Sequence, residues 1–300
     1  VAAAIATTRE NDVFRPGVRL SERLSATTDL EAALTEADVV VSAVPTQFIR
    51  KTFTPVAAAL RTDRVLVSVS KGIEVDTLLT PAEIFAEVVA GPAASTITAL
   101  SGPSFAREVA ARYPTAVVAA STSADNAHQV RELFSTASFR VYSSDDVTSV
   151  ELGGALKNVI AIAAGITEGL RFGHNSIAAL ITRGLAEMTR LGVARGGRPL
   201  TFAGLSGMGD LVLTCTGGLS RNRAVGIALG QGKPIDQILA DMNMVAEGVK
   251  TTLAARALAA QVGVEMPITE QVYQVLYEGK DPGTVAQRLM SRQLRDESER

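Results

Sequence analysis

A lysine and an asparagine interrupt an otherwise apolar or small-residue stretch, GGALKNVIAIAAGI, which runs from Gly153 to Ile166. A helix that is apolar all round belongs inside a protein. A buried ammonium there must find a partner, extend to water or lose its proton. Lys157 is therefore either a structural lysine whose stem lies along a neighbouring helix or a functional lysine in a site. The segment alone leaves both interpretations open.

A second candidate site lies in the glycine-rich stretch GLSGMGD, residues 204–210, and in the sequence LVLTCTGGLSRNR that follows it. Ser220 stands at the expected N-cap of a helix whose first residues are Arg221, Asn222 and Arg223. Cations are unfavourable at a helix N-terminus, whereas free backbone N–H groups together with a guanidinium bind anions. We predict a phosphate site here, and the alternative is a capped surface helix with solvated arginines.

Several other polar residues have both a structural and a functional interpretation. Asp210 closes the glycine-rich loop, either as a helix N-cap or as a carboxylate that orients a substrate hydroxyl or pairs with the buried lysine. Gly102 and Ser104 lie in SGPS, which is an ordinary strand-to-helix turn or a second set of N–H donors. Lys71 also follows a strand, and it is either part of an ordinary turn or a residue of the site. Glu247 either begins a helix or binds a ribose.

Alternating strand-like and helix-like segments in the first half of the chain must position these residues. Expected strands cover 38–45, 64–70, 96–100, 115–120 and 139–142, and expected helices cover 47–60, 78–90, 104–112 and 124–136. This alternation indicates a doubly wound α/β sheet with right-handed crossovers. Ligands of such sheets bind at the carboxyl ends of the strands. Those ends carry the residues around Lys71, Gly102 and Ser104.

The strand pattern stops after Asp146, and the rest of the chain reads as helical. Expected helices cover 148–170, 176–192, 221–230, 235–241, 248–262, 267–277 and 282–293. A chain of 300 residues is too long for one ordinary hydrophobic core. We therefore expect an α/β domain over residues 1–146 and an all-α domain over residues 147–300.

Composition excludes several classes of protein. The chain is 47% hydrophobic and 20% charged with a net charge of −2, so no basic face is available for nucleic acid or anionic lipid. Its single cysteine, Cys215, excludes an internal disulfide and a cysteine-rich metal cage. The two histidines, His128 and His174, lack metal-ligand spacing. With no run of 18 apolar residues and no visible signal peptide, we expect a cytoplasmic protein without membrane insertion.

Taken together, these segments resemble the bacterial NAD(P)-dependent glycerol-3-phosphate dehydrogenases. The similar blocks follow the family's order over nearly the whole chain and include RENDVFRPGVRL, VVVSAVPTQ, SKGIE, SGPSFAREVA, GGALKNVIAIAAGI, TFAGLSGMGDLVLTCTGGLSRNR, VAEGVKT and GVEMPITEQVYQVLYEG. The resemblance implies a Rossmann-type dinucleotide-binding domain followed by a helical substrate-binding domain. It also implies reversible reduction of dihydroxyacetone phosphate, a small phosphorylated triose, to sn-glycerol 3-phosphate for phospholipid synthesis.

The resemblance further assigns roles to residues at matching positions. Lys157 would donate and accept the proton at the C2 oxygen of the substrate. The substrate would contact Lys71, Gly102, Ser104, Lys157, Asp210, Ser220, Arg221 and Asn222. The NAD or NADP cofactor would contact Lys71, Ala106, Arg221, Val245 and Glu247, and no metal is implied. The family often carries Thr at the position of Ser104, and both residues supply a hydroxyl.

This chemistry accounts for a lysine in an apolar helix. Hydride reaching a carbonyl carbon leaves negative charge on its oxygen, which a nearby ammonium stabilises and then protonates. Partial burial lowers the pKa of a lysine toward neutrality, which suits a reversible proton donor. We expect the small residues Gly153, Gly154 and Ala161 to let cofactor and substrate approach that face of the helix.

The family opens with a strand, a Gly-x-Gly-x-x-Gly turn and a helix that hold the cofactor pyrophosphate. The first residues here, VAAAIATTRENDVFRPG, match the region just after the second strand. We therefore expect an N-terminally incomplete sheet that lacks about 30 residues and has an exposed edge. The segment that distinguishes NADH from NADPH lies in that part of the family, so cofactor preference is not readable.

Two alternatives stay open at this stage. One is another two-domain NAD(P)-dependent dehydrogenase that acts on hydroxy acids, against which the GGLSRNR anion site speaks. The other is a truncated chain that binds substrate but is inactive. The resemblance also implies a homodimer formed through the helical domain.

Overall fold

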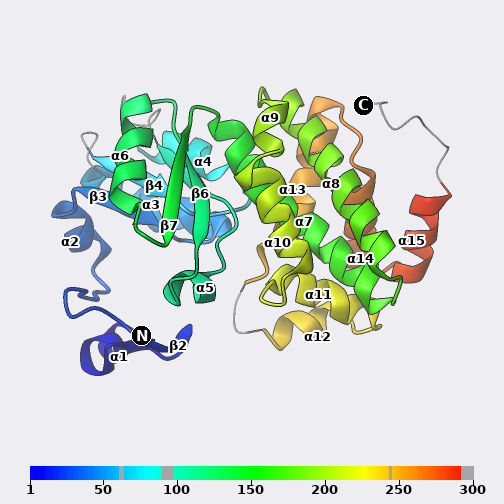
Figure 1. The fold of residues 1–300 in the computed structure, drawn as a ribbon, viewed down its shortest axis with the longest axis horizontal. Coiled ribbons are helices and arrows are strands. Elements are labelled where there is room, and N and C mark those ends of the chain that lie inside the picture. The colour runs from blue at the N-terminus through cyan, green and yellow to red at the C-terminus, as the bar shows by residue number, and fades with distance from the viewer. Residues whose placement is uncertain (61–63, 90–96, 243–244, 292–300) are drawn as a thin grey trace.

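The computed structural model describes residues 1–60, 64–89, 97–242 and 245–291. A sheet with flanking helices forms one half of the molecule, and a bundle of helices forms the other half beside it (Figure 1). The expected combination of an α/β domain with an all-α domain is confirmed.

The N-terminal segment forms a small unit below the sheet (Figure 1). It consists of α1 (Ala2–Thr8) and an antiparallel hairpin of β1 (Glu10–Asn11) and β2 (Arg15–Arg19). Helix α2 (Leu30–Thr35) follows, and its N-cap Asp29 accepts a hydrogen bond from the backbone N–H of Ala32 at 2.9 Å. The sequence patterns did not predict these elements.

The main sheet has five strands in the order β3-β4-β5-β6-β7. Their bounds are β3 Val39–Ser42, β4 Val65–Ser68, β5 Thr98–Ser101, β6 Thr115–Ala120 and β7 Phe139–Ser144. All five expected strands are therefore present, although position 96 of the third lies outside the described residues. Residues after β4 and β5 reach the same edge, because these two strands run parallel with Val67 opposite Thr98.

The connection between β5 and β6 differs from the expected right-handed crossovers. β5 and β6 pair antiparallel, with Ala99 opposite Ala120, whereas β3–β4, β4–β5 and β6–β7 pair parallel. A parallel connection needs a crossover of a dozen or more residues that is usually a full helix. The connecting segment instead contains only the short helix α5 (Ala106–Ala110), and the chain re-enters the sheet from the edge where β5 ends.

Helices and helical turns lie between these strands, as expected. They are the 3-10 turn Thr46–Phe48, α3 Ile49–Phe53, the 3-10 turn Thr54–Ala59, α4 Pro81–Val88 and α6 Ala124–Phe134. Thr80 and Glu83 form a capping box at the start of α4, in which the Thr80 N–H donates to the Glu83 carboxylate at 2.8 Å. Position 90 of the expected helix 78–90 lies outside the described residues.

The C-terminal half is entirely helical in the described residues. Its elements are α7 Val147–Gly169, α8 His174–Ala194, α9 Pro199–Phe202, a π-helical turn Leu205–Gly209, α10 Asp210–Thr216, α11 Arg221–Gly230, α12 Ile235–Ala240, α13 Glu247–Val262, α14 Pro267–Glu278 and α15 Pro282–Met290. The sequence patterns missed α9, and they offered α10 only in the alternative that makes Asp210 an N-cap, a position that Gly209 occupies. The last expected residues, 292–300, lie outside the described part of the chain.

Helix α7 is the centre of the helical half. Its N-cap Asp146 accepts a hydrogen bond from the Ser149 N–H at 3.0 Å, and every residue from Ser149 to Ile166 is buried. By length and hydropathy α7 could span a membrane, but 94% of that window is buried inside the molecule. The surrounding helices cover it on all sides, so α7 is a core helix.

Helices α7 and α11 pack at unusually close range. An ideal Cβ built on Gly165 would lie 2.1 Å from the backbone oxygen of Arg223, and one built on Gly226 would lie 2.1 Å from that of Ile162. Backbones can approach this closely only where side chains are absent. This contact brings the first residues of α11 beside the middle of α7, where Lys157 lies.

Candidate active site

Lys157 does not extend to water, because its ammonium is enclosed by polar groups of α10. The Nζ atom donates to Asp210 Oδ1 at 2.8 Å and to Thr214 Oγ1 at 2.8 Å, and Lys157 is only 7% exposed. The Thr214 hydroxyl donates in turn to the backbone oxygen of Asp210 at 2.6 Å. The buried ammonium is thus paired and hydrogen-bonded, the condition that makes such burial tolerable.

A second lysine approaches the other oxygen of the same carboxylate. Lys71 Nζ donates to Asp210 Oδ2 at 2.6 Å and to the backbone oxygen of Gly102 at 3.0 Å. Asp210 is 1% exposed, so it is a buried carboxylate shared by two ammonium groups. The sheet supplies one of these lysines and α7 the other, and Asp210 joins the two halves of the molecule.

The pKa values of this cluster reflect the competition between burial and charge. Burial, helped by the positive charge of Lys71, lowers the pKa of Lys157 to about 8, while Asp210 opposes the change. Burial alone would raise the pKa of Asp210, but the charges of Lys71 and Lys157 outweigh it and hold that pKa below its usual value. The cluster therefore keeps a carboxylate ionised beside an ammonium that can lose its proton near neutral pH.

The turn before α10 makes one close backbone contact with α7 and a second with the end of α9. An ideal Cβ on Gly153 would lie 2.7 Å from the Ser206 oxygen, and one on Gly207 would lie 2.0 Å from the Phe202 oxygen. An ideal Cβ on Gly154 would lie 2.8 Å from Ser101 Oγ. The expectation that Gly153 and Gly154 leave room for ligands is wrong, because the protein's own π-helical turn and strand end occupy that space.

A chain of amide contacts links α7, α11 and α13. Asn222 Nδ2 donates to Asn158 Oδ1 at 2.9 Å, and Asn222 Oδ1 accepts from the Gly248 N–H at 3.0 Å. Both asparagines are buried, so each makes contacts that fix the orientation of the other. The role of Asn158 as the link was not predicted, although its place beside Lys157 in an apolar run is the pattern that could have indicated it.

The start of α11 has the expected cap. Ser220 Oγ accepts from the Arg223 N–H at 3.2 Å, and Ser220 is 5% exposed. Arg223 turns back to pair with Glu168 of α7, whereas Arg221 is exposed. Of the two arginines in this turn, Arg221 is therefore the one positioned to meet a ligand.

The turn after β5 contributes Gly102 and Ser104 to the same region. Gly102 has φ +139°, and an ideal Cβ there would lie 2.9 Å from Val117 Cα, so the position favours glycine. Ser104 Oγ donates to the Gly102 oxygen at 3.0 Å, which is the oxygen that also accepts from Lys71. Ala106 begins α5 close by and is exposed.

Glu247 begins α13 and joins that helix to the end of β3. Its Oε1 accepts from the Thr46 N–H at 3.1 Å, and burial raises its pKa although Thr46 and Arg221 oppose the change. Val245 lies beside it and is 45% exposed. Hydrogen bonds thus connect Lys71, Gly102, Ser104, Asp210 and Lys157 into one cluster, while Asn222 connects α7 to the start of α13, where Glu247 contacts Thr46.

Three hydroxyls at this edge are enclosed by the protein's own chain. Thr46 Oγ1, Ser101 Oγ and Thr251 Oγ1 are buried without a hydrogen-bond partner in the described part of the chain. An ideal Cβ on Gly72 would lie 2.8 Å from Thr46 Oγ1, so glycine is what lets the chain pack against that hydroxyl. The charged groups of Lys71 and Glu247 and the exposed Arg221 and Val245 are the features of this region that suit a dinucleotide.

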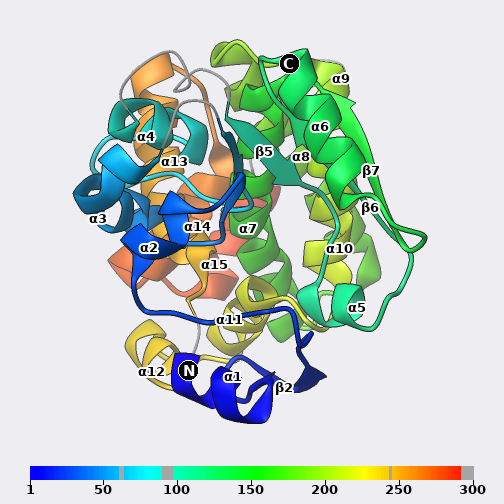
Figure 2. The same cartoon turned by 90° about the vertical axis from the view of Figure 1, so that its left-hand side faces the viewer.

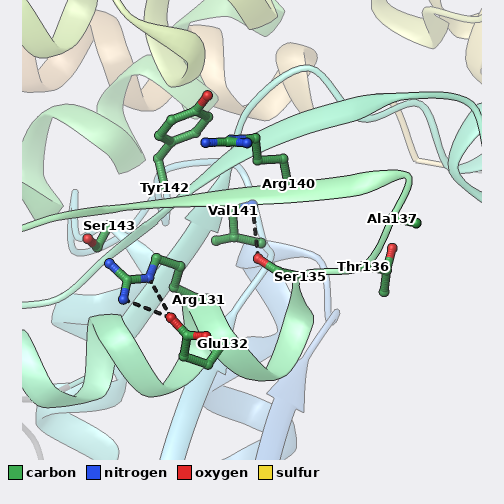
Figure 3. Close-up of a pocket in the computed structure, with 9 residues that line it drawn as sticks. All are labelled: Arg131, Glu132, Ser135, Thr136, Ala137, Arg140, Val141, Tyr142 and Ser143. Carbon is green, nitrogen blue, oxygen red and sulfur yellow. Dashed lines mark hydrogen bonds and ion pairs between the residues drawn. The ribbon is translucent and has the colours of Figure 1, made fainter.

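A separate pocket of about 560 Å³ lies on α6 and the edge strand β7 (Figure 3). Arg140 and Tyr142 line one side of the strand, with the guanidinium 5.2 Å from the ring centroid, and Arg131 pairs with Glu132 on the other side. None of the predicted site residues lines this pocket. In the described residues, no group of three or more His, Cys, Asp or Glu side chains could hold a metal ion.

Comparisons with known proteins agree over both halves. The family model for the NAD-dependent glycerol-3-phosphate dehydrogenase N-terminus matches residues 1–127, and that for the C-terminus matches residues 146–287. The chain is 57% identical over 289 residues to a glycerol-3-phosphate dehydrogenase [NAD(P)+] of Citrifermentans bemidjiense, covering 96% of this chain and 86% of the relative.

Two further relatives extend the comparison. The glycerol-3-phosphate dehydrogenase [NAD(P)+] of Geobacter sulfurreducens is 57% identical over 290 residues, covering 97% of this chain and 87% of the relative. The crystal structure of glycerol-3-phosphate dehydrogenase from Coxiella burnetii superimposes with a TM-score of 0.93 at 37% identity, covering 97% of this chain and 88% of that one.

Proposed function

Because this chain belongs to the NAD-dependent glycerol-3-phosphate dehydrogenase family, we propose that Lys157 is the acid–base residue of its reaction. The enzyme is an NAD(P)-dependent oxidoreductase that interconverts dihydroxyacetone phosphate and sn-glycerol 3-phosphate, for glycerophospholipid synthesis. The single observation that carries the role of Lys157 is its buried Nζ, which is held by Asp210 and Thr214 at 2.8 Å each.

The reaction needs a proton at the C2 oxygen of the substrate. The bound nicotinamide supplies the hydride when the ketone is reduced and accepts it in the reverse direction. The Lys157 ammonium stabilises the negative charge that develops on the oxygen, then transfers its proton and becomes a neutral amine. Solvent returns that proton before the next turnover. In the reverse direction the neutral amine accepts the hydroxyl proton.

Asp210 and Thr214 orient this lysine. The carboxylate favours the charged form and holds the Nζ in place, and the Thr214 hydroxyl fixes a second direction. Since Lys71 binds the other carboxylate oxygen, it limits how strongly Asp210 can hold the proton on Lys157. We propose that the substrate meets these groups together with Gly102 and Ser104, whose turn lies next to Lys71.

Arg221, Asn222 and Ser220 are proposed to bind the phosphate of the substrate. Arg221 is exposed and unpaired in the described chain, and it stands at the N-terminus of α11, where backbone N–H groups favour an anion. Asn222 is held by Asn158 and Gly248, and the cap Ser220 fixes the turn. These contacts support a preformed phosphate site.

The proposed cofactor contacts are Lys71, Ala106, Arg221, Val245 and Glu247. Lys71, Arg221 and Glu247 supply charges at the edge where the sheet meets α13, and Val245 and Ala106 are exposed beside it. Either NAD or NADP would occupy this edge.

The test of the phosphate assignment compares dihydroxyacetone phosphate with unphosphorylated dihydroxyacetone while NADH or NADPH oxidation is followed. We expect kcat/KM for the phosphorylated ketone to be far higher, and Arg221→Ala to remove most of that difference. Equal rates on the two ketones would contradict the role of Arg221 and Asn222 without touching that of Lys157.

The domain boundary is proposed at residues 146 and 147, giving domains 1–146 and 147–300. The N-cap Asp146 supports it, because α7 begins directly after this residue. Limited proteolysis followed by mass spectrometry tests it. Release of fragments cut within α7 would contradict the assignment.

A cytoplasmic location and a homodimer through the helical half are also proposed. NAD(P)H is available in the cytoplasm, and the helical half exposes the apolar side chains Leu200, Met208, Val212 and Val193, which could each contact a second copy. Cell fractionation tests the location. Sedimentation of wild type against Leu200→Asp tests the dimer, and an unchanged monomer in both would contradict it.

A further inference from the structure

The loop between β5 and α5 brings an aromatic ring of the sheet half onto the end of α10. Both views place α5 near α10 (Figures 1 and 2). An ideal Cβ built on Gly217, which follows α10, would lie 2.5 Å from Cε2 and 2.9 Å from Cζ of Phe105. The Phe105 ring therefore lies directly against the backbone of Gly217, an approach that the absence of a side chain permits.

Gly217 is the first residue of the turn 217–220, which leads into α11. Its backbone oxygen accepts a hydrogen bond from the Ser220 N–H at 3.2 Å. The Ser220 hydroxyl in turn caps the first turn of α11, which begins at Arg221. The Phe105 ring thus touches the chain at the point from which the proposed phosphate site is built.

The loop that carries this ring is itself held at the sheet edge and at the other end of α10. An ideal Cβ on Gly209, which precedes α10, would lie 3.7 Å from Cδ and Cγ of Pro103, an ordinary van der Waals distance. The backbone oxygen of Gly102 accepts from Lys71 Nζ at 3.0 Å. Phe105 therefore extends from an anchored loop, and its ring can restrain what it touches.

The turn before α11 receives little support from its own side chains. Gly217 and Gly218 carry none, and Leu219 is 42% exposed. An ideal Cβ on Gly218 would meet nothing within 4 Å, so this part of the turn lies open. Two successive glycines also have more backbone freedom to lose than other residues. The Phe105 ring at one end and the Ser220 cap at the other therefore restrain the turn together.

We propose that Phe105 is a positioning residue for the phosphate site at the start of α11, because its ring holds the turn 217–220 from the sheet half. This inference rests on the proposed phosphate-binding role of Arg221 and Asn222 and adds the residue that fixes their place. Phosphate binding by the helical half then depends on the docking of the sheet half against it. Phe105 acts through the turn and takes no part in proton transfer.

The experiment uses the full chain and measures kcat and KM for dihydroxyacetone phosphate and the inhibition constant of inorganic phosphate. The variants are Phe105→Ala and Phe105→Leu, with the exposed Phe172→Ala as a control. We expect Phe105→Ala to raise both the KM and the inhibition constant about tenfold, while kcat changes by less than about threefold. Leucine fills part of the space, so Phe105→Leu should have a smaller effect. Thermal melting of each variant checks that the fold is retained.

A double-mutant cycle with Arg221→Ala tests the route by which the ring acts. If Phe105 acts by placing Arg221, the loss of phosphate binding in the double variant should be smaller than the product of the two single losses. Losses that multiply fully would show that the ring and the arginine act independently, which contradicts the proposal. Unphosphorylated dihydroxyacetone lacks the group that the turn would bind, so its kcat/KM should stay the same in Phe105→Ala.

An unchanged KM and an unchanged inhibition constant in a folded Phe105→Ala overturn the proposal. A fall in kcat with a shifted pH profile and an unchanged KM also overturns it, because the ring would then act through Lys71 and Asp210. If Arg221→Ala weakens phosphate binding while Phe105→Ala does not, the phosphate site stands and only the positioning role is lost. If neither variant changes binding, the phosphate site itself is wrong.

Discussion

Helix α7 carries two buried ionisable side chains that its surroundings treat in opposite ways. Lys157 meets an ionised carboxylate and a hydroxyl, and burial lowers its pKa to about 8. Glu151 Oε1 accepts a hydrogen bond from the Ala82 N–H at 2.9 Å, and Oε2 has no hydrogen-bond partner in the described residues. Burial raises the pKa of Glu151 to about 7.

The comparison shows that the groups around a buried side chain decide whether it stays charged. Lys157 faces α10 and the sheet edge, where Asp210 compensates its charge. Glu151 faces the capping box of α4 and the carboxylate of Glu83. The negative charge of Glu83 adds to the effect of burial and raises the pKa of Glu151 further, so the neutral, protonated form costs less to bury than the charged form. One group is thus held as an ion pair, which suits the proton transfer proposed for it, and the other joins α7 to α4.

The largest expected effect comes from removing the amine. Lys157→Met keeps the length and packing of the side chain but cannot transfer a proton, so kcat should fall about 10³-fold. Steady-state assays with dihydroxyacetone phosphate and NADPH or NADH measure it, with the exposed Lys233→Met as a control. More than a few per cent of wild-type kcat in Lys157→Met would contradict the proposed role, provided that the melting temperature is unchanged.

Removing the shared carboxylate should cost stability as well as activity. Asp210→Asn leaves two ammonium groups beside each other without a counter-charge, and breaking a buried pair costs about 3–5 kcal/mol. Urea unfolding measures the free energy of unfolding, with the exposed Asp236→Asn as a control. Equal stability of Asp210→Asn and wild type at pH 7 would show that the carboxylate does not hold these lysines.

Glu151→Gln tests the second buried group of α7 through the pH dependence of stability. Because the pKa of Glu151 is raised in the folded state, its contribution to stability is fully present below about pH 4.5 and is lost as the pH rises through 7. This rise in the pKa should lower the free energy of unfolding by about 3 kcal/mol between pH 5 and pH 8. Glutamine keeps an acceptor for the Ala82 N–H but does not titrate, so it should remove this pH dependence of the free energy of unfolding.

Urea unfolding of wild type and Glu151→Gln at several pH values checks this prediction, with the exposed Glu36→Gln as a control. If both wild type and Glu151→Gln lose the same stability between pH 5 and pH 8, another group is responsible. Activity should change little, since Glu151 contacts α4 and not the proposed site.

The smallest effect is the pH dependence of turnover. In the proposed role Lys157 is protonated when the ketone is reduced and neutral when the alcohol is oxidised, and burial lowers its pKa to about 8. We expect kcat/KM for reduction to fall about tenfold per pH unit above 8, and kcat/KM for oxidation to rise up to that pH. Profiles that bend in the same direction for both reactions would contradict the assignment.

Much of the site was predictable because its residues break local rules. Lys157 is a cation in an apolar helix, and Arg221 is a cation at a helix N-terminus, so both stood out without a structure. Thr214 and Asn158 did not, because a threonine one turn after an aspartate and an asparagine in a helix are common. A search for polar residues at i+4 from Asp210 would have found Thr214.

The sequence determined the succession of elements, the change from alternating to purely helical patterns, and the identity of the charged groups, because hydrophobic periodicity and helix caps are local properties. Only the tertiary structure decided that β6 runs antiparallel to β5, that glycines of α7 admit the protein's own backbone, and that Asp210 lies between Lys157 and Lys71. These features depend on contacts between residues far apart in the chain, where burial and the charge of a distant partner set both the geometry and the pKa.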